Sequence, residues 1–166
     1  MVDSTAGVAT NPPLGGTDRA SLLVDGTPGK GRGVFAARRW HTAGLVISAR
    51  ITAISPRRTT YSFQTGIDTH CDFDEPARLL NHSCLPNLGI RDNAAGAFDF
   101  LALRPIGVGD ELTWDYASSE YHSIAVPACA CGAPSCRGTI VGYAGLTPAQ
   151  RRRLTHLAGY LTSPTD

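Results

Sequence analysis

Between residues 22 and 116 the apolar positions form short runs, and Gly, Pro, Asp or Asn separates most of these runs. Several runs are rich in β-branched and aromatic residues, which favour strands. In the segment Phe98-Asp99-Phe100-Leu101 apolar and polar positions begin by alternating, as in a half-buried strand. The pattern therefore predicts a mostly β domain built from many short strands. The expected strands cover residues 22–24, 33–36, 45–54, 61–63, 98–103 and 111–114.

One longer helix is predicted near the C-terminal end of the sequence. Thr147 supplies an N-cap, Pro148 suits the first helical position, and Gln150 completes a capping box. The apolar residues that follow would share one face of this helix, and they are Leu154, Leu157, Ala158 and Leu161. Residues 74–80 are expected to form one or two helical turns, because Pro76 suits a first-turn position.

Two further segments are interpreted from their composition. Residues 1–20 are rich in Gly, Pro, Ser and Thr without any periodicity, which predicts a flexible N-terminal tail. Residues 68–75 carry four acidic side chains and neither Lys nor Arg. We interpret this segment as a solvated loop, and the alternative is an acidic lip that attracts a basic peptide.

The composition narrows the class of protein. A chain of 166 residues with an apolar fraction of 42% suits one folded domain. A net charge of +1 gives no reason to expect a nucleic-acid or membrane surface. No basic segment followed by an apolar stretch opens the sequence, so we expect no signal peptide and an intracellular protein. Such a protein would be cytoplasmic in a bacterium and could be nuclear in a eukaryote.

Three of the five cysteines crowd into one short segment, as Cys129-x-Cys131-x4-Cys136. In a reducing compartment such a cluster indicates a metal site before a disulfide. Zinc prefers four tetrahedral ligands, so a fourth ligand must come from elsewhere in the chain. The thiol candidates are Cys84 and Cys71, and the imidazole candidates are His82 and His122. The alternative is a set of small buried thiols.

Three further segments carry a resemblance to a known family when they are read together with this cluster. They are GKGRGVF at 29–35, RLLNHSCLPN at 78–87 and GDELTWDY at 109–116. In this order, and followed by the cysteine cluster, they resemble the SET-domain protein-lysine methyltransferases that carry a post-SET zinc-binding tail. The resemblance runs from about residue 22 to residue 142.

The resemblance implies a fold of small curved β-sheets in which the NHS and ELTWDY segments cross as a pseudoknot, an exception to the rule against threading. A post-SET zinc loop and the C-terminal helix would complete this fold. The implied organisation is a tail at 1–20, a SET domain at 21–120, a post-SET zinc-binding segment at 121–142, and a C-terminal helix and tail at 143–166.

The resemblance also assigns site residues. S-adenosyl-L-methionine would contact Lys30, Gly31, Arg32, Gly33, Asn81, His82 and Tyr116. One structural Zn²⁺ would be bound by Cys84, Cys129, Cys131 and Cys136. The catalytic residues would be Tyr116, Tyr61 and Trp114. Each of these assignments has a structural alternative. The glycines could form a strand-entry turn, and the Asn81–His82 pair could belong to a polar turn. Tyr61 could be an ordinary aromatic residue of a strand.

The implied reaction adds methyl groups from S-adenosyl-L-methionine to the side-chain amine of lysine in a protein substrate with an accessible lysine. In the family, the residue at the position of Trp114 is usually Phe or Tyr, and it tunes the number of methyl groups added. A larger ring favours a low number if it lines the channel, and the alternative is that Trp114 faces the core. Two other functions stay open, namely transfer to a small peptide or non-protein amine, and an inactive zinc-stabilised binding module.

Overall fold

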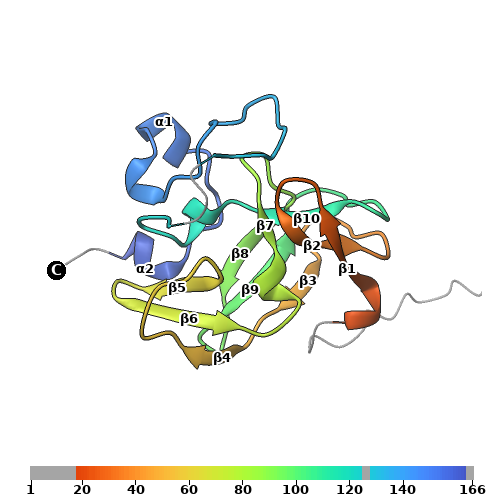
Figure 1. The fold of residues 1–166 in the computed structure, drawn as a ribbon, viewed down its shortest axis with the longest axis horizontal. Coiled ribbons are helices and arrows are strands. Elements are labelled where there is room, and N and C mark those ends of the chain that lie inside the picture. The colour runs from red at the N-terminus through yellow and green to blue at the C-terminus, as the bar shows by residue number, and fades with distance from the viewer. Residues whose placement is uncertain (1–17, 125–127, 164–166) are drawn as a thin grey trace, which may run out of the picture.

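The computed structural model describes residues 18–124 and 128–163, and these residues form three small β-sheets with short helices at the C-terminal end. In Figure 1 the sheets lie against one another in the middle of the molecule, and the C-terminal helices flank them on one side. The fold is mostly β, as the apolar pattern predicts. No helix within the described residues is long and apolar enough to cross a membrane.

The three sheets differ in size. The first has four strands in the order β1 (Leu22–Thr27), β2 (Gly31–Ala36), β10 (Glu111–Trp114) and β7 (Asn81–His82). The second has three strands in the order β3 (Leu45–Ser48), β9 (Phe98–Ala102) and β8 (Leu88–Asp92). The third has three strands in the order β4 (Ile51–Ile54), β6 (Thr69–Phe73) and β5 (Ser62–Gly66).

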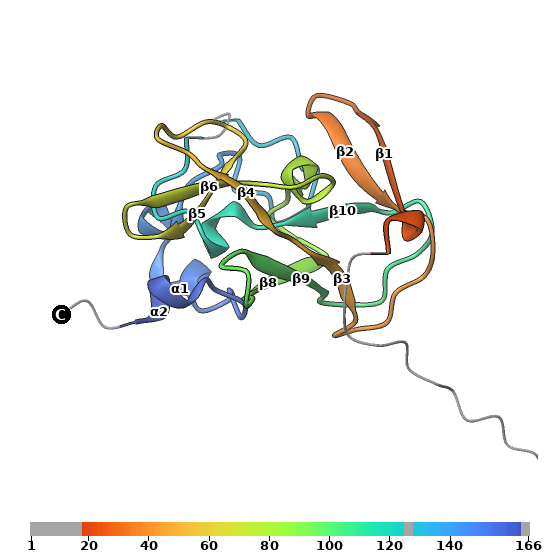
Figure 2. The same ribbon diagram turned by 90° about the horizontal axis from the view of Figure 1, so that it is seen from below.

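The central feature of the first sheet is the position of β10, which brings together segments that are distant in sequence. β10 pairs with β2 in the antiparallel sense, with Leu112 opposite Val34. On its other edge β10 pairs with β7 in the parallel sense, with Trp114 opposite His82. The two motifs of the expected crossing therefore lie side by side, and Figure 2 shows the β1–β2 hairpin projecting at the opposite end of the molecule from the C-terminal helices.

The core lies between the sheets and is built from inward-facing residues of several strands. Val34, Phe100 and Leu112 are completely buried. Phe73 meets Phe63 in a stacked pair with ring centroids 4.1 Å apart, and it meets Phe98 edge to face at 5.5 Å. Burial of side chains this size supplies about 1.5–3 kcal/mol each, so these contacts fix how the sheets pack.

The prediction of one long C-terminal helix is wrong. The segment forms two single turns, α1 (Pro148–Arg151) and α2 (Gly159–Thr162). The capping box between Thr147 and Gln150 is present, so the predicted start of the helix is correct. After α1 the helical bonding is not continued, since the N–H groups of Arg153 and Leu154 donate only three residues back, to the Gln150 and Arg151 carbonyls. Further along, backbone groups bond to other segments. The N–H of Ala158 donates to the Ser118 carbonyl, and the N–H of Gly159 donates to Asp92 Oδ2.

Within residues 18–124 and 128–163 there are also four 3-10 helices, namely η1 (Arg19–Ser21), η2 (Ala77–Leu79), η3 (Tyr116–Ser118) and η4 (Tyr143–Gly145). The predicted helical turn near Pro76 corresponds to η2, which begins after that residue. Most of the predicted flexible tail, residues 1–17, lies outside the described residues. The predicted tail extends too far, because residues 19 and 20 belong to η1.

The interpretation of residues 68–75 as a solvated loop or acidic lip is wrong for most of the segment. Thr69–Phe73 form β6, the middle strand of its sheet, with Cys71 and Phe73 buried. The acidic side chains are held by neighbours. Asp72 accepts a hydrogen bond from the Ser55 hydroxyl at 2.9 Å, and Asp74 accepts one from the Arg50 N–H at 2.9 Å.

Candidate active site

A cavity of about 350 Å³ lies beside the turn between β1 and β2. The segment after β6, the β7 strand and the cysteine-rich loop form its other walls. Six of the seven residues predicted to contact the cofactor line it, namely Lys30, Gly31, Arg32, Asn81, His82 and Tyr116. Further lining residues, with no cofactor role predicted from the sequence, include Thr60, Glu75, Arg78, Leu80, Ala130 and Ile140.

Asn81 connects the β1–β2 hairpin to β10. Its amide nitrogen donates to the Arg32 carbonyl at 3.0 Å and to Glu111 Oε1 at 2.9 Å. The other carboxylate oxygen of Glu111 forms an ion pair with Lys30 Nζ. Both side chains of this pair are mostly buried, so solvent screens their interaction less than that of a surface pair. The set of Lys30, Asn81 and Glu111 is called the hairpin clamp below.

Gly33 does not line the cavity, which differs from its predicted role of direct cofactor contact. It lies against the hairpin clamp instead. A Cβ atom at Gly33 would come within 3.0 Å of both Asn81 Nδ2 and Glu111 Oε1, and it would overlap Thr27 Oγ1. Glycine is therefore required here for close packing. By contrast Gly31 has a φ of +77°, a left-handed conformation that glycine adopts without strain.

Tyr116 lies at the start of η3, directly after β10. Its hydroxyl donates to the Leu80 carbonyl at 3.2 Å, and its backbone N–H donates to His82 Nδ1 at 3.3 Å. Burial raises the pKa of the Tyr116 hydroxyl well above its usual range, and the nearby Glu120 and Glu111 carboxylates raise it further. The hydroxyl is therefore protonated at neutral pH, with its proton directed to Leu80 and its oxygen free to accept.

His82 is neutral at the same pH. Burial lowers its pKa to about 4, although Asp115 opposes the shift. Because Nδ1 accepts the Tyr116 N–H, the ring proton resides on Nε2, which lies 3.4 Å from Cys84 Sγ. His82 thus links the tyrosine to the cysteine cluster through its two ring nitrogens.

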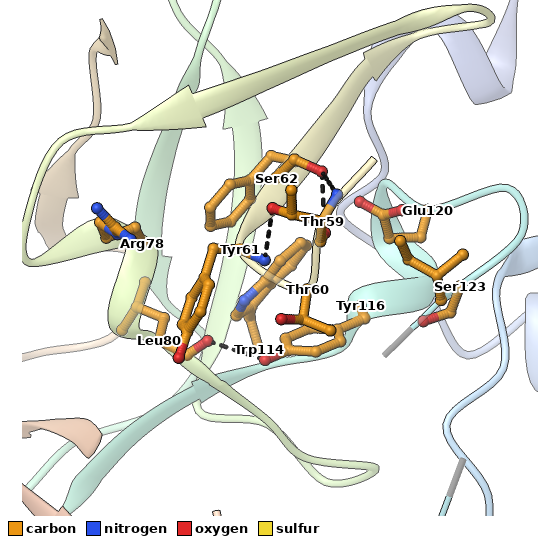
Figure 3. Close-up of a pocket in the computed structure, with 12 residues that line it drawn as sticks. Thr59, Thr60, Tyr61, Ser62, Arg78, Leu80, Trp114, Tyr116, Glu120 and Ser123 are labelled. Atoms are coloured by element: carbon orange, nitrogen blue, oxygen red, sulfur yellow. Dashed lines mark hydrogen bonds between the residues drawn. The ribbon is translucent and has the colours of Figure 1, made fainter. Parts of the chain in front are cut away.

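A second, narrower hollow adjoins the first cavity and shares Thr60, Tyr61, Arg78, Leu80 and Tyr116 with it. Its volume is about 30 Å³. Figure 3 shows Tyr61, Trp114 and Tyr116 lying together in this hollow, with Arg78 beside Tyr61 and Glu120 on the opposite side. Tyr116 therefore stands where a wide cavity meets a narrow aromatic channel.

Trp114 belongs to the core and also lines the narrow hollow. It is 2% exposed, and its ring stacks on Phe63 with centroids 5.6 Å apart. It also meets Tyr116 at 5.1 Å in a tilted arrangement. The indole N–H is buried without a hydrogen-bond partner among the described residues. The two alternatives from the sequence are thus not exclusive, because one residue serves both as core and as channel wall.

Tyr61 directly precedes β5 and lines both the cavity and the hollow. It is 54% exposed, unlike Tyr116 and Trp114. The Arg78 guanidinium lies over its ring at 5.2 Å from the centroid, a cation–π contact. Tyr61 therefore forms an outer wall of the channel.

The cysteine-rich loop forms one wall of the cavity, through Ala128, Cys129 and Ala130. The four predicted zinc ligands come together, and the Sγ atoms of Cys84, Cys129, Cys131 and Cys136 all lie within 4.8 Å of one another. Cys71 lies apart from them, buried in β6.

The spacing of these sulfurs fits a tetrahedral ion. A Zn–S bond of about 2.3 Å places tetrahedral sulfurs about 3.8 Å apart, and Cys84 Sγ lies 3.7 Å from Cys129 Sγ. Backbone N–H groups donate to the sulfurs, among them those of Arg137 to Cys84 at 3.4 Å and of Gly138 to Cys136 at 3.3 Å. Four thiolates carry more negative charge than one Zn²⁺ ion neutralises, so hydrogen-bond donors around the sulfurs stabilise such a site.

Arg137 also ties this loop to the motif that contains Tyr116. Its guanidinium donates two hydrogen bonds to Asp115, at 2.7 and 2.8 Å. Asp115 in turn caps η3 by accepting the Ala117 N–H. The cysteine-rich loop is therefore anchored one residue before Tyr116.

Comparison with protein families gives a match over half of the chain. The family described as the SET domain matches residues 31–117. This range holds the β2, β7 and β10 strands that build the cavity, together with Tyr116.

Several curated relatives are similar over part of the chain. Methyltransferase flvH of Aspergillus flavus is 37% identical over 101 residues, which cover 60% of this chain and 56% of the relative. The histone-lysine N-methyltransferase, H3 lysine-4 specific, of Schizosaccharomyces pombe is 45% identical over 65 residues, or 37% of this chain and 7% of the relative. The chain thus spans about half the length of the first relative and a small part of the second.

Two solved structures share the fold. The crystal structure of KRYPTONITE in complex with mCHG DNA and SAH has a TM-score of 0.56 at 26% identity, covering 72% of this chain and 28% of that one. The methyltransferase domain of human histone-lysine N-methyltransferase SETMAR has a TM-score of 0.55 at 21% identity, covering 73% of this chain and 58% of that one. The second likeness concerns the fold alone.

Proposed function

The chain belongs to the SET domain family, and on that premise we propose that it transfers methyl groups from S-adenosylmethionine to the side-chain amine of lysine in a protein. The observation that carries the proposal is the position of the Tyr116 hydroxyl, where the wide cavity meets the narrow aromatic hollow. The size of the first space suits a cofactor, and the aromatic lining of the second suits the alkyl stem of a lysine side chain. Two reactants entering from the two spaces would meet at this hydroxyl.

The cavity fits S-adenosylmethionine because glycine backbone and polar side chains meet there. The turn at Lys30, Gly31 and Arg32 offers close backbone approach, and Asn81 and His82 face it from β7. When bound, the cofactor would supply the methyl group and a positive sulfonium. Zinc on the four cysteines would hold the loop that forms one wall of the cavity.

The amine must lose a proton before it can attack. A lysine with a pKa near 10.4 costs about 4–5 kcal/mol to neutralise at pH 7. Burial between Tyr61, Trp114 and Tyr116 lowers this cost, because a low-dielectric channel disfavours the charged form. The Tyr116 oxygen then accepts a hydrogen bond from the neutral amine and orients its lone pair. Alignment of this kind contributes a large share of rate enhancement in two-reactant chemistry.

We further propose that Trp114 limits the number of methyl groups added, because its indole lies in the wall of the narrow hollow. A Trp114→Phe variant would leave more space beside the amine and should shift the product towards trimethyl-lysine. Mass spectrometry after exhaustive reaction measures this distribution. Abundant trimethyl-lysine from the wild-type protein would contradict the proposal.

A second acceptor class, a small non-protein amine, is favoured by one observation. β5 is an edge strand, where an extended peptide could add by backbone pairing. At this edge the Gln64 N–H already donates to Glu120 Oε1, and the Tyr121 N–H donates to Gln64 Oε1. Residues 120–121 therefore occupy part of the position that a peptide strand would take.

The test begins with isothermal titration of the zinc-loaded protein with S-adenosylmethionine. Labelled cofactor is then incubated with a lysate of the host and, separately, with a panel of small alkylamines. Label on a protein lysine supports the main proposal, and label on small amines alone favours the second. Cofactor binding without transfer to any acceptor would leave the chain as a zinc-stabilised binding module.

We expect the partner to be a protein with an accessible lysine, and we propose no direct contact with nucleic acid. The near balance of 15 basic and 14 acidic residues supports this expectation. The KRYPTONITE complex contains DNA, but the match to this chain covers only 28% of the KRYPTONITE chain. A filter-binding assay with duplex DNA at low salt checks the expectation, and salt-dependent retention would contradict it.

A further inference from the structure

Glu120 has no assigned role in the site described so far, although it lines the narrow hollow together with Tyr116. It follows Tyr116 by four residues, and its N–H donates to the Tyr116 carbonyl at 2.8 Å. Among the described residues that line the hollow, Glu120 is the one that bears a carboxylate. It is 7% exposed, so its charge is held largely away from solvent.

The known contacts of this carboxylate leave acceptor capacity unused. Oε1 accepts the Gln64 N–H at 2.9 Å, and Oε2 accepts one Arg58 guanidinium N–H at 2.9 Å. A carboxylate offers about four acceptor positions, so a further donor can be accommodated. Arg58 also donates to the His122 carbonyl, and it is not among the residues that line the hollow. The guanidinium therefore lies behind Glu120, and the hollow lies in front.

The Glu120 carboxylate interacts electrostatically with the Tyr116 hydroxyl, which also lines the hollow. Burial raises the pKa of the Glu120 carboxyl, while the Gln64 N–H and the Arg58 guanidinium oppose the rise. The same carboxylate contributes to the raised pKa of Tyr116. Arg58 thus compensates only part of the cost of burying this anion, and a second cation would be stabilised beside it.

We propose that Glu120 is a positioning residue that binds the ammonium form of the acceptor at the end of the hollow remote from Arg78. The proposal rests on the function proposed above, because it takes the hollow to be the entry route of the amine. The ammonium would donate hydrogen bonds to the Glu120 carboxylate, which favours its charged form. As it moves away from this carboxylate to the apolar rings beside Tyr116, it would release one proton to water and become the neutral amine. In Figure 3 Glu120 and Arg78 lie on opposite sides of the aromatic residues, so a cation between them would be repelled by Arg78 and attracted by Glu120.

The test measures binding of n-butylammonium chloride to the zinc-loaded protein saturated with S-adenosylhomocysteine. Glu120→Gln keeps the shape and removes the charge, and it should weaken n-butylammonium binding at least about tenfold. Arg58→Gln breaks the same ion pair but keeps the carboxylate, and it should tighten binding severalfold. A purely structural role would weaken binding in both variants. Binding of neutral 1-butanol serves as the control and should not differ among the three proteins.

Equal n-butylammonium affinity in wild type and Glu120→Gln would overturn the inference, as would absence of binding to the wild type. If Glu120→Gln does not fold, Arg58→Gln still decides, since unchanged or weaker binding contradicts the proposal. Failure of the proposed methyl transfer can be told apart from failure of the ammonium site. Ammonium binding that depends on Glu120, without methyl transfer to any amine, would contradict methyl transfer and leave the ammonium site standing.

Discussion

The Tyr116 hydroxyl donates to the Leu80 carbonyl, and this single contact fixes the direction in which its oxygen accepts. Removing the hydroxyl in Tyr116→Phe leaves the ring and its packing in place. We expect turnover to fall by about two orders of magnitude or more, because an oriented hydrogen bond to the reacting amine is lost. Radiolabel transfer measures turnover.

Cofactor affinity is the control for this variant and should change little, since the phenyl ring still lines the cavity. Normal turnover of Tyr116→Phe would refute the catalytic assignment.

The raised pKa of Tyr116 also predicts the pH dependence of the reaction. A tyrosine with its usual pKa near 10 would ionise within an alkaline assay, whereas the buried Tyr116 keeps its proton there. The acceptor amine becomes neutral as pH rises, so the rate should increase from pH 7 to 10 without a falling limb from this tyrosine. Initial rates at saturating cofactor test this, and a fall in rate that is absent in Tyr116→Phe would contradict it.

Among single residues, the sequence identified those that belong to local motifs and missed those defined by tertiary neighbours. Asn81, His82 and Tyr116 were assigned from their motifs, and all three line the cavity. Glu111 stood inside a motif, but its role depends on Lys30, which is 81 residues away. Glu120 gave no local signal at all, because only the packing of β5 against residues 119–121 brings it into the hollow.

At the scale of elements, the β1–β2 hairpin illustrates how close packing sets a wall of the site. Gly33→Ala would push a methyl group against Asn81 and Glu111. We expect a loss of about 1–3 kcal/mol of stability and weaker S-adenosylmethionine binding, because the hairpin clamp must shift. Urea denaturation and isothermal titration measure the two effects.

The same hairpin offers a matched control for this change. A Cβ atom at Gly26 in β1 would meet nothing within 4 Å, so Gly26→Ala should leave both properties unchanged. Equal stability and equal S-adenosylmethionine affinity of the two variants would contradict the proposed requirement for close packing at Gly33.

The strands that the sequence predicted have short apolar runs or alternating apolar and polar positions, whereas the missed strands contain glycine or acidic residues that obscure such a pattern. β8 contains Gly89, which weakens a strand pattern. The glycine is needed because His156 packs there, and a Cβ would come within 2.6 Å of its ring. β6 carries acidic residues that look solvated until Ser55 and Arg50 are seen to bind them. The C-terminal apolar positions fit a helix, but backbone bonds to Ser118 and Asp92 divide it.

At the scale of the whole molecule, the loop that carries three of the clustered cysteines connects the cavity wall to the motif that contains Tyr116. On the proposed zinc and cofactor assignments, removing the ion with a chelator should lower Tm and abolish tight S-adenosylmethionine binding together, because Cys129 and Ala130 form part of that wall. Cys136→Ser should have the same effect in the absence of chelator. Metal analysis, thermal melts and isothermal titration provide the three measurements.

Cys71→Ala is the matched control, since Cys71 is a buried thiol outside the cluster. It should retain one zinc per chain and bind cofactor normally. Loss of zinc in Cys71→Ala, or its retention in Cys136→Ser, would contradict the assigned ligand set.

Lys30 carries the only side-chain amine in the sequence, and its ion pair with Glu111 places that amine at the rim of the cavity. An amine-reactive dye or acylating reagent therefore has one internal target in the molecule, and it should react slowly because Lys30 is mostly buried and paired with Glu111. Protection of this position by an added compound would report occupancy of the adjoining space without any turnover. The same scarcity of lysine keeps background low when candidate acceptors are screened by mass, because the protein itself offers almost no competing target.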